Sequence, residues 1–362
     1  MRRDHPNPFR KLPSILIAAC GLMLASCAST RPVANVPLAP PEPYTRIAHP
    51  DTNTVQLQIA VRKFLPTHHR GPVVWLAGTS HIGDPDYYRA LQKHLDAQTL
   101  VLFEGVNAGT HKRHVRKSAE SPITSPPAKS TPGQPDASEP PGIQTTMAKS
   151  LGLVFQLDAI NYDRLNFLNS DLSIQQIQRL IAGRAADAPD ASASAAGAGE
   201  PAAGNASFQN LMQAMDGSSF LGSVMRMGLH FIGSSAKLQA ITKLAFIEVL
   251  GELKGNLTAM KGMPPDMQQL IQVLIEARNR TVIEDLKTES KLIPRSGSIA
   301  IFYGTGHMDD MEKRLTGDLH YHPAGELWLT AFSVELHQTG LSASELAMVQ
   351  NLIKYQMSQL QQ

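Results

Sequence analysis

Two short apolar runs, far apart in the chain, continue into nearly the same residues. Residues 73–77 (Val-Val-Trp-Leu-Ala) lead into Gly-Thr-Ser-His81, and residues 299–303 (Ile-Ala-Ile-Phe-Tyr) lead into Gly-Thr-Gly-His307. Runs of this length, rich in β-branched and aromatic residues and ended by glycine, are typical of buried strands. The pattern therefore predicts two buried strands, each with a histidine just beyond its carboxyl end.

The rest of the pattern alternates between strands and helices. We expect further strands at 55–64, 99–103 and 327–336. We expect helices at 84–94, 146–153, 172–180, 308–315 and 341–360, and several more across 208–287. Strand-helix-strand order with apolar strands favours an α/β fold. Its central sheet would be mainly parallel, built from two related β-α-β halves with an inserted helical cap at 208–290.

Three segments lack apolar periodicity and are dominated by Pro, Ala, Gly and Ser. The first, at 27–52, is proline-rich and is typical of a tether. The others, at 108–142 and 182–206, bury too little apolar surface to offset the entropy of ordering them, so we expect disordered loops. The domain itself would then span 53–336, and a C-terminal helix would occupy 337–362.

The first 26 residues have the layout of an export signal. A start containing Arg and Lys, at 2–11, precedes an apolar stretch at 12–25 that is too short for a permanent membrane span. The residues before Cys27 resemble a bacterial lipobox, which predicts lipidation of Cys27; a competing match at Cys20 leaves a shorter apolar core. An ordinary signal with an incidental cysteine is the alternative. Because Ala28 follows the cysteine, we expect an outer-membrane lipoprotein that faces the periplasm or the cell surface.

Composition narrows the chemistry further. Both cysteines, Cys20 and Cys27, precede the predicted domain, so the domain has no disulfide and no cysteine nucleophile. The formal net charge is +2, with no concentrated basic stripe, so we expect no nucleic-acid partner. Glycine-rich phosphate loops and a Gly-x-Ser-x-Gly motif are absent from the sequence. Any acid–base or metal chemistry therefore depends on His, Asp and Glu.

Three such residues follow apolar strands directly: His81, Glu104 and His307. In a parallel sheet, the carboxyl ends of the strands meet at one edge, where ligands bind. Two imidazoles and one carboxylate suit Zn²⁺, Mn²⁺ or Fe²⁺ and leave positions open for water. A histidine at a strand end is, taken singly, most often an ordinary polar residue. Glu104 alone would more often cap a helix or form an ion pair. The repeated motif raises the metal hypothesis above these alternatives.

Other polar residues have simpler interpretations. Asp84 and Asp310 occupy the same place after the two histidines, and both are expected to cap the helix that follows. His230 lies in a stretch rich in Met and Leu and is expected to be packed in the core.

The two Gly-x-x-His motifs at 78–81 and 304–307, with Glu104 between them, resemble the TraB/PrgY/GumN family, which includes the Tiki Wnt-cleaving proteases. Residues 151–173 resemble the middle segment of that family, and residues 277–280 (Ala-Arg-Asn-Arg) resemble its Arg-Asn helix. The resemblance covers most of 73–336 apart from the loops. The fold of that family is related to the ChaN and erythromycin-esterase groups, so the resemblance implies a fold of this kind.

The resemblance implies a metal-dependent hydrolase of the peptidase kind, which acts on a peptide or a small molecule. His81, Glu104 and His307 would hold a divalent ion (Zn, Mn, Co or Fe), and Arg278 and Asn279 would line the pocket. Arg278 would hold a substrate carboxylate or orient Glu104. Asp171 would support the site or cap the helix after it.

Two other readings remain open at this point. The same histidines would also serve a non-catalytic lipoprotein that binds haem, a metal or a peptide, as the ChaN relationship suggests. A scaffold that has lost activity is the third.

Overall fold

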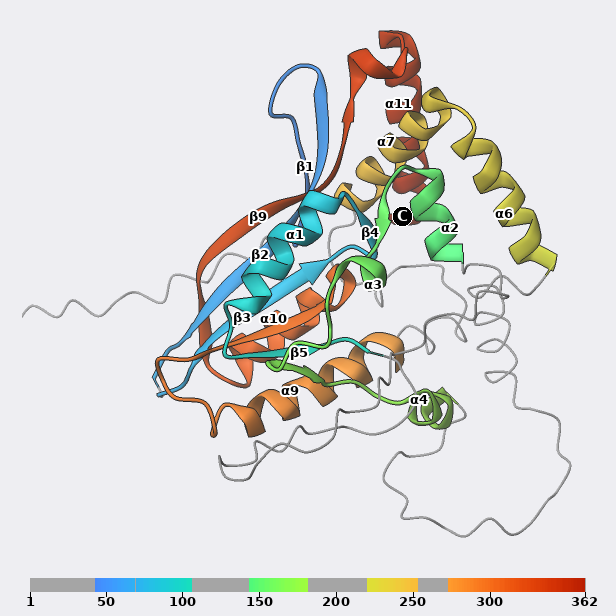
Figure 1. Ribbon diagram of the computed structural model, residues 1–362. Coiled ribbons are helices and arrows are strands. Elements are labelled where there is room, and N and C mark those ends of the chain that lie inside the picture. The colour runs from blue at the N-terminus through green and yellow to red at the C-terminus, as the bar shows by residue number, and fades with distance from the viewer. Residues whose placement is uncertain (1–42, 69, 106–142, 182–219, 253–272, 362) are drawn as a thin grey trace, which may run out of the picture. The chain divides into compact units, whose positions relative to one another are not determined.

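The computed structural model describes residues 43–68, 70–105, 143–181, 220–252 and 273–361 (Figure 1). The predicted signal segment, the lipidation residue Cys27 and the loops at 108–142 and 182–206 lie outside the described residues. Within them, the chain is a mixed α/β protein with a seven-stranded sheet. Along the sheet lie β1 (Thr45–Ala48), β2 (Thr54–Pro66), β3 (Val73–Thr79), β8 (Ser298–Gly304), β5 (Leu100–Phe103) and β7 (Phe167–Asn169), while β9 (Tyr321–Glu335) pairs with β2.

Only part of this sheet is parallel. β3, β8, β5 and β7 run parallel to one another, whereas β2 pairs antiparallel with β1, β3 and β9. The expectation of a mainly parallel sheet therefore holds for one half only. The two expected β-α-β halves are also incomplete, because the strand after β8 is β9, which pairs antiparallel with β2 and does not continue the parallel half.

Helices cover both faces of the sheet. They are α1 (Pro85–Asp96), α2 (Ile143–Ser150), α3 (Gln156–Ala159), α4 (Ile174–Ile181), α6 (Phe220–Gly233), α7 (Ala236–Glu252), α9 (Arg278–Glu289), α10 (Met308–Gly317) and α11 (Ala343–Gln361). Short turns of other helix types precede α9 (η2, Val273–Ala277), α10 (η3, Thr305–His307) and α11 (η4, Leu336–Thr339), and β4 (Ile82–Gly83) pairs with β6 (Val154–Phe155). Among the described helices, none is both long enough and apolar enough to cross a membrane.

Strand β8 shows how the sheet separates two cores. Ala300 and Phe302 join the core beneath α1, α2 and α7, while Ile301 and Tyr303 join the core beneath α9 and α10. Side chains alternate between the faces of a strand, so a strand buried on both sides must be apolar throughout. The sequence pattern of 299–303 therefore gave the correct prediction.

Most expected elements within the described residues are confirmed. Strand β7 was not predicted, and three further differences concern β9, the tether and His230. β9 begins at Tyr321, well before the predicted residue 327, since its first half is an exposed strand that carries little apolar signal. The end of the predicted tether forms β1, and Tyr44 beside it is buried. His230 is exposed and not packed in the core.

The described helices of the region predicted as a helical cap lie in different places. Helix α6 packs against α2 and α7. Helix α7 packs against β1, β2 and β9, where Ala240, Leu244 and Ile247 enter the core. It therefore covers a face of the sheet in its antiparallel part. Helix α9, by contrast, begins with Arg278 and Asn279, both buried.

Candidate functional site

The strands that carry the two histidines are neighbours. β3 and β8 pair in parallel up to Thr79 and Gly304, and β5 pairs with the other side of β8 through Phe103 and Phe302. His81, Glu104 and His307 follow these three adjacent strands directly. The predicted convergence of the three residues at one edge of the sheet is therefore found in the structure.

Gly304 lies at the centre of the three residues. A methyl group placed on its Cα would be 3.5 Å from Glu104 Oε2, 3.7 Å from His81 Nε2 and 3.9 Å from His307 Cδ2. The N–H of Gly304 also donates a hydrogen bond to Glu104 Oε2 at 2.8 Å. The absence of a side chain at this position therefore leaves a space that all three groups border.

Asn279 fixes the tautomer of His307. Its amide nitrogen donates to the backbone oxygen of His307 at 3.1 Å and to Asp310 Oδ2 at 2.9 Å. Its oxygen therefore faces His307 Nδ1, at 2.6 Å, so Nδ1 carries the hydrogen. The lone pair of His307 is then on Nε2, which lies 3.7 Å from Glu104 Oε1.

Arg278 joins two carboxylates below the site. Its Nε and Nη2 bond Asp171 at 2.8 and 2.6 Å, and Nη2 also donates to Glu104 Oε1 at 2.7 Å. A guanidinium has the planar geometry for such paired contacts. Of the two roles predicted for Arg278, the structure contains the contact with Glu104.

The contacts of three aspartates decide between their expected roles. Asp171 supports the site through Arg278, one of its two expected roles, and does not cap α4, because Ser173 and Gln176 exchange the reciprocal capping bonds at 2.8 and 3.2 Å. Asp310 accepts the Asn279 amide, and Asp84 stands at the N-cap of α1 without a side-chain capping bond. Asp84 therefore has the predicted N-cap position without the capping bond, whereas Asp310 lies inside α10 and bonds Asn279 instead of capping the helix.

Glu104 and His307 both have pKa values well below their ordinary values. Burial alone would raise the pKa of Glu104, but His307, Arg278, His81 and the N–H of Gly304 lower it to about 2. Burial lowers the pKa of His307 to about 4, against the attraction of Glu104. At neutral pH, Glu104 is therefore ionised and His307 is neutral, so Arg278 is the permanent cation beside the carboxylate.

The chemistry of these donors fits a divalent ion, since metal ligands must be deprotonated. A ligating histidine also usually donates its second ring N–H to a supporting group, as His307 does to Asn279. Their placement fits less well. Across the described residues, no group of three or more His, Cys, Asp or Glu side chains is arranged to hold a metal ion.

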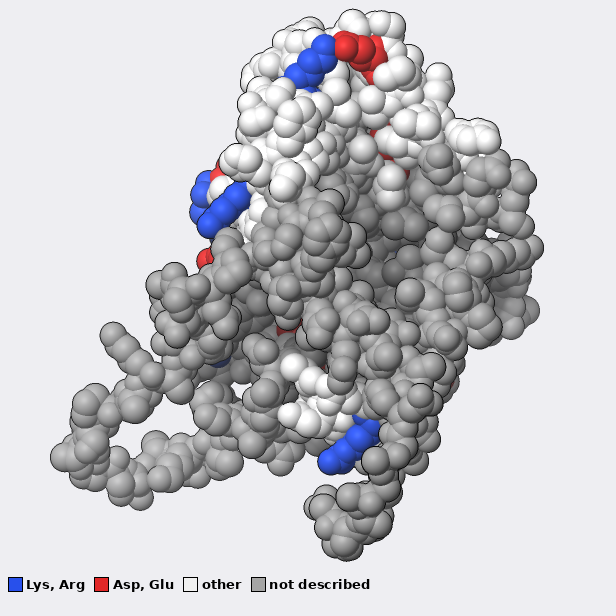
Figure 2. Space-filling model, turned by 90° about the vertical axis from the view of Figure 1, so that its right-hand side faces the viewer, with Lys and Arg blue, Asp and Glu red and all other residues white. Residues whose placement is uncertain are grey.

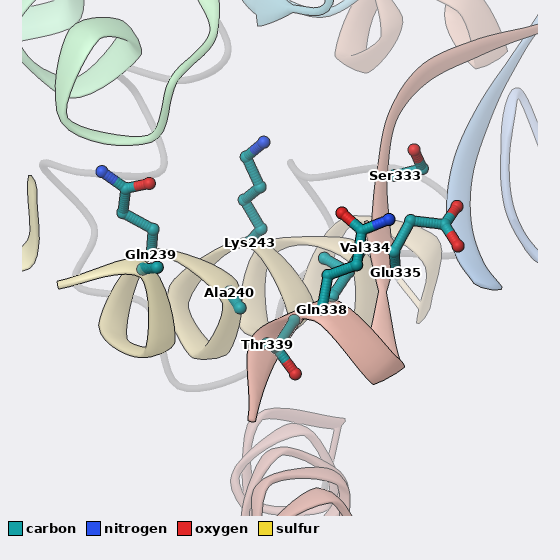
Figure 3. Close-up of a pocket in the computed structure, with 9 residues that line it drawn as sticks. Gln239, Ala240, Lys243, Ser333, Val334, Glu335, Gln338 and Thr339 are labelled. Atoms are coloured by element: carbon teal, nitrogen blue, oxygen red, sulfur yellow. The ribbon is translucent and has the colours of Figure 1, made fainter. Parts of the chain in front are cut away.

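A cavity found in the structure lies elsewhere (Figure 3). It is bordered by α7, by the end of β9 and by η4, and its walls include Gln239, Lys243, Ser333 and Glu335. None of the predicted site residues lines it. Figure 2 shows the charged side chains on one face of the molecule. There the described Lys and Arg side chains lie apart from one another and do not gather into one patch.

The sequence did not predict the hydrogen bonds of Gln156 and Tyr162. Both residues were noted only as part of the segment 151–173 that resembles the family. Gln156 donates its backbone N–H to the oxygen of His81 at 2.8 Å and its side-chain amide to Tyr162 at 2.8 Å. No local pattern indicates such contacts, because they depend on the pairing of β4 with β6.

Comparison with known proteins adds no family assignment. No protein-family model matches this chain, and no curated protein or solved structure matches it either. The TraB/PrgY/GumN resemblance therefore stays a prediction that depends on the motifs around His81, Glu104 and His307.

Proposed function

We propose that this protein is a membrane-anchored, metal-dependent hydrolase of the TraB/PrgY/GumN kind, which cleaves an amide bond in a peptide or a related small molecule. Its place of action would be the periplasmic side of the bacterial cell envelope, with Cys27 as the lipidated residue. The observation that carries the proposal is the meeting of His81, Glu104 and His307 around the open side of Gly304.

The protonation states support this chemistry. A general base that works alone is most effective with a pKa near the working pH, whereas Glu104 and His307 both hold protons weakly at pH 7. Such groups are better suited to hold a cation, which in turn makes water acidic. A divalent ion (Zn, Mn, Co or Fe) would supply this polarisation if His81, Glu104 and His307 turned toward one another to bind it, because the described residues hold no preformed group of three ligands.

Each residue then has a defined task. Asn279 keeps the His307 lone pair on Nε2, and Arg278 keeps Glu104 ionised and fixed in position. Glu104 is too weak a base for ordinary water, but it would suffice for water that a bound cation has made acidic. It would then accept the proton that this water loses when the water oxygen bonds to the amide carbon. It passes this proton to the amine nitrogen as the carbon–nitrogen bond breaks.

The test is cleavage of a mixed peptide pool by the purified full chain, followed by mass spectrometry, with and without added Mn²⁺, Co²⁺ or Zn²⁺. We expect cleavage that His81→Ala and His307→Ala both abolish. His337→Ala is a matched control, since His337 is exposed and distant in sequence from every site residue. Full activity in either of the first two variants would refute the assignment.

A non-catalytic binding protein is the second candidate, favoured by the exposure of His81. An accessible imidazole beside a buried one suits capture of haem, a metal or a peptide. Addition of haem to the same preparation distinguishes the two functions. A Soret band that disappears in His81→Ala, without peptide cleavage by the wild type, would establish the binder.

A further inference from the structure

Two side chains beside the site have hydrogen-bonding groups without partners. Gln156 is 4% exposed, and its Oε1 is buried with no partner in the structure. Its amide nitrogen donates to the hydroxyl oxygen of Tyr162 at 2.8 Å. Because that oxygen accepts from Gln156, the hydroxyl hydrogen of Tyr162 points elsewhere, and no described residue accepts it.

Both side chains belong to the same edge of the sheet as the site. Gln156 begins α3, directly after β6, and its N–H is bonded to the oxygen of His81 at 2.8 Å. The ring of Tyr162 stacks on Phe302, with centroids 6.2 Å apart and planes at 27°. It also packs against Phe103, the residue before Glu104, at 5.0 Å. Tyr162 is therefore held between the strands that end at Glu104 and Gly304.

The surroundings keep the Tyr162 hydroxyl protonated. Burial raises the pKa of Tyr162, the hydrogen bond from Gln156 lowers it, and the negative charge of Glu104 raises it again. The net direction is upward, so at neutral pH the hydroxyl is a hydrogen-bond donor. Tyr162 is thus a neutral donor, whereas the ionised Glu104 carboxylate only accepts.

We propose that Tyr162 and Gln156 form a subsite that recognises the backbone of an extended peptide. The Tyr162 hydroxyl donates to a substrate carbonyl, and Gln156 Oε1 accepts a substrate N–H. In an extended chain, the N–H and C=O of one residue point to the same side, so a single residue offers both groups. Pairing these groups also removes the cost of leaving the buried Oε1 unsatisfied.

This inference rests on the proposed function and narrows its substrate to extended peptide backbone. As the reaction proceeds, the carbonyl oxygen gains negative charge, and a neutral donor such as Tyr162 stabilises that charge. The competing explanation is structural: Gln156 only holds the Tyr162 ring, and a buried water satisfies Oε1.

The kinetic test uses the full chain and a quenched fluorescent peptide chosen from those that the wild type cleaves. Tyr162→Phe should lower kcat about 100-fold with little change in KM, as expected for loss of one donor to an oxyanion. Tyr321→Phe is the matched control, because it also removes a buried hydroxyl, bonded to the oxygen of Pro72 at 3.2 Å. Equal activity of the Tyr162 and Tyr321 variants would overturn the proposal.

Gln156→Glu separates the two explanations. A carboxylate only accepts, so it would keep a bond to Tyr162 but take the hydroxyl hydrogen that the substrate needs. We expect a loss similar to that of Tyr162→Phe. The folded fraction of Gln156→Glu is measured by urea unfolding, because a carboxylate at this buried position would itself cost stability. Activity near that of the wild type, or activity that falls only in proportion to the loss of folded protein, would refute the subsite.

A binding test distinguishes failure of the subsite from failure of the proposed function. The probes are an N-acetyl dipeptide methylamide and its ester analogue, in which oxygen replaces one N–H, measured with a chelator present. The wild type should bind the amide about tenfold more tightly, and Gln156→Met should remove this preference. A wild type that shows the preference but cleaves nothing supports the subsite and refutes the hydrolase. Equal binding of both probes, or of neither, refutes the subsite even if cleavage occurs.

Discussion

Replacement of Arg278 by methionine tests whether one guanidinium holds the centre together. The arginine and Asp171 side chains are 6% and 0% exposed, and Glu104 is 15% exposed. The substitution keeps an unbranched side chain but removes three charge-assisted hydrogen bonds of 2.6–2.8 Å. Two carboxylates are then left in the interior without their cation. Removal of one partner from a buried ion pair costs about 3–5 kcal/mol, so we expect Arg278→Met to lose that much stability at pH 7.

The measurement is urea unfolding followed by circular dichroism, with Arg164→Met as the control. Arg164 pairs with Asp96 at 3.1 Å, but the two side chains are 48% and 34% exposed. An exposed pair contributes about 0.2–1 kcal/mol, so this variant should be nearly as stable as the wild type. Similar losses in the two variants would refute the reasoning.

The pH dependence of the same loss gives an independent check. Glu104 has a folded pKa of about 2, below its ordinary value of 4.5, so its stabilising contribution is complete above pH 4.5 and declines as the pH falls towards 2. In Arg278→Met, protonation of Glu104 relieves an unpaired buried charge. The difference between wild type and variant should therefore shrink as the pH falls. Addition of Glu104→Gln to the variant should restore part of the loss at pH 7, because it removes one of the unpaired charges.

Three further predictions concern the centre itself. Gly304→Ala should keep its stability within about 1 kcal/mol of the wild type, because the new methyl group meets other atoms only at 3.5–3.9 Å. It should abolish peptide cleavage, because the methyl group fills the space between the three side chains. Undiminished cleavage would contradict the site. Burial lowers the pKa of His307 from 6.5 to about 4. As the pH drops from 6.5 to 4, the unfolded chain takes up this proton before the folded protein does, so the free energy of unfolding should fall by up to about 3 kcal/mol. In His307→Gln, urea unfolding across this range should show a smaller dependence of stability on pH. Asn279→Leu removes the bond at 2.6 Å that fixes the tautomer of His307 and should cost about 1–3 kcal/mol of stability. Nitrogen NMR of His307 should then show a mixture of tautomers, and a single tautomer would contradict the role of Asn279.

The apolar pattern was sufficient to find the strands that carry the site. Residues 73–77 and 299–303 are apolar at every position, which is typical of a strand buried on both faces. β8 is buried in this way, and β3 is buried except at Val73 and Trp75, which are half-buried. The proline after Asp84 likewise predicted the start of α1, because its missing N–H is not needed in the first helical turn. These features are local, so the sequence alone could reveal them.

The partners of the site residues could not be found in this way. Asp171 and Arg278 are 107 positions apart, and Asn279 reaches His307 across 28 positions. As isolated sequence features, an Arg-Asn pair near the start of a helix is typical of a solvated surface, and an aspartate before a helix is typical of a cap. Their burial follows from the packing of α9 beneath β8, which no local pattern encodes.

The sequence by itself determined that two histidine-bearing strands and one strand ending in glutamate exist, because periodicity records which faces of an element are buried. Only the tertiary structure decided that β8 lies between β3 and β5, that β9 pairs antiparallel with β2, and that Arg278 and Asn279 support the centre. Strand order and side-chain pairing depend on burial and electrostatic free energies summed over the whole domain. Those sums involve contacts between residues far apart in the chain, so they emerge only when the whole chain packs.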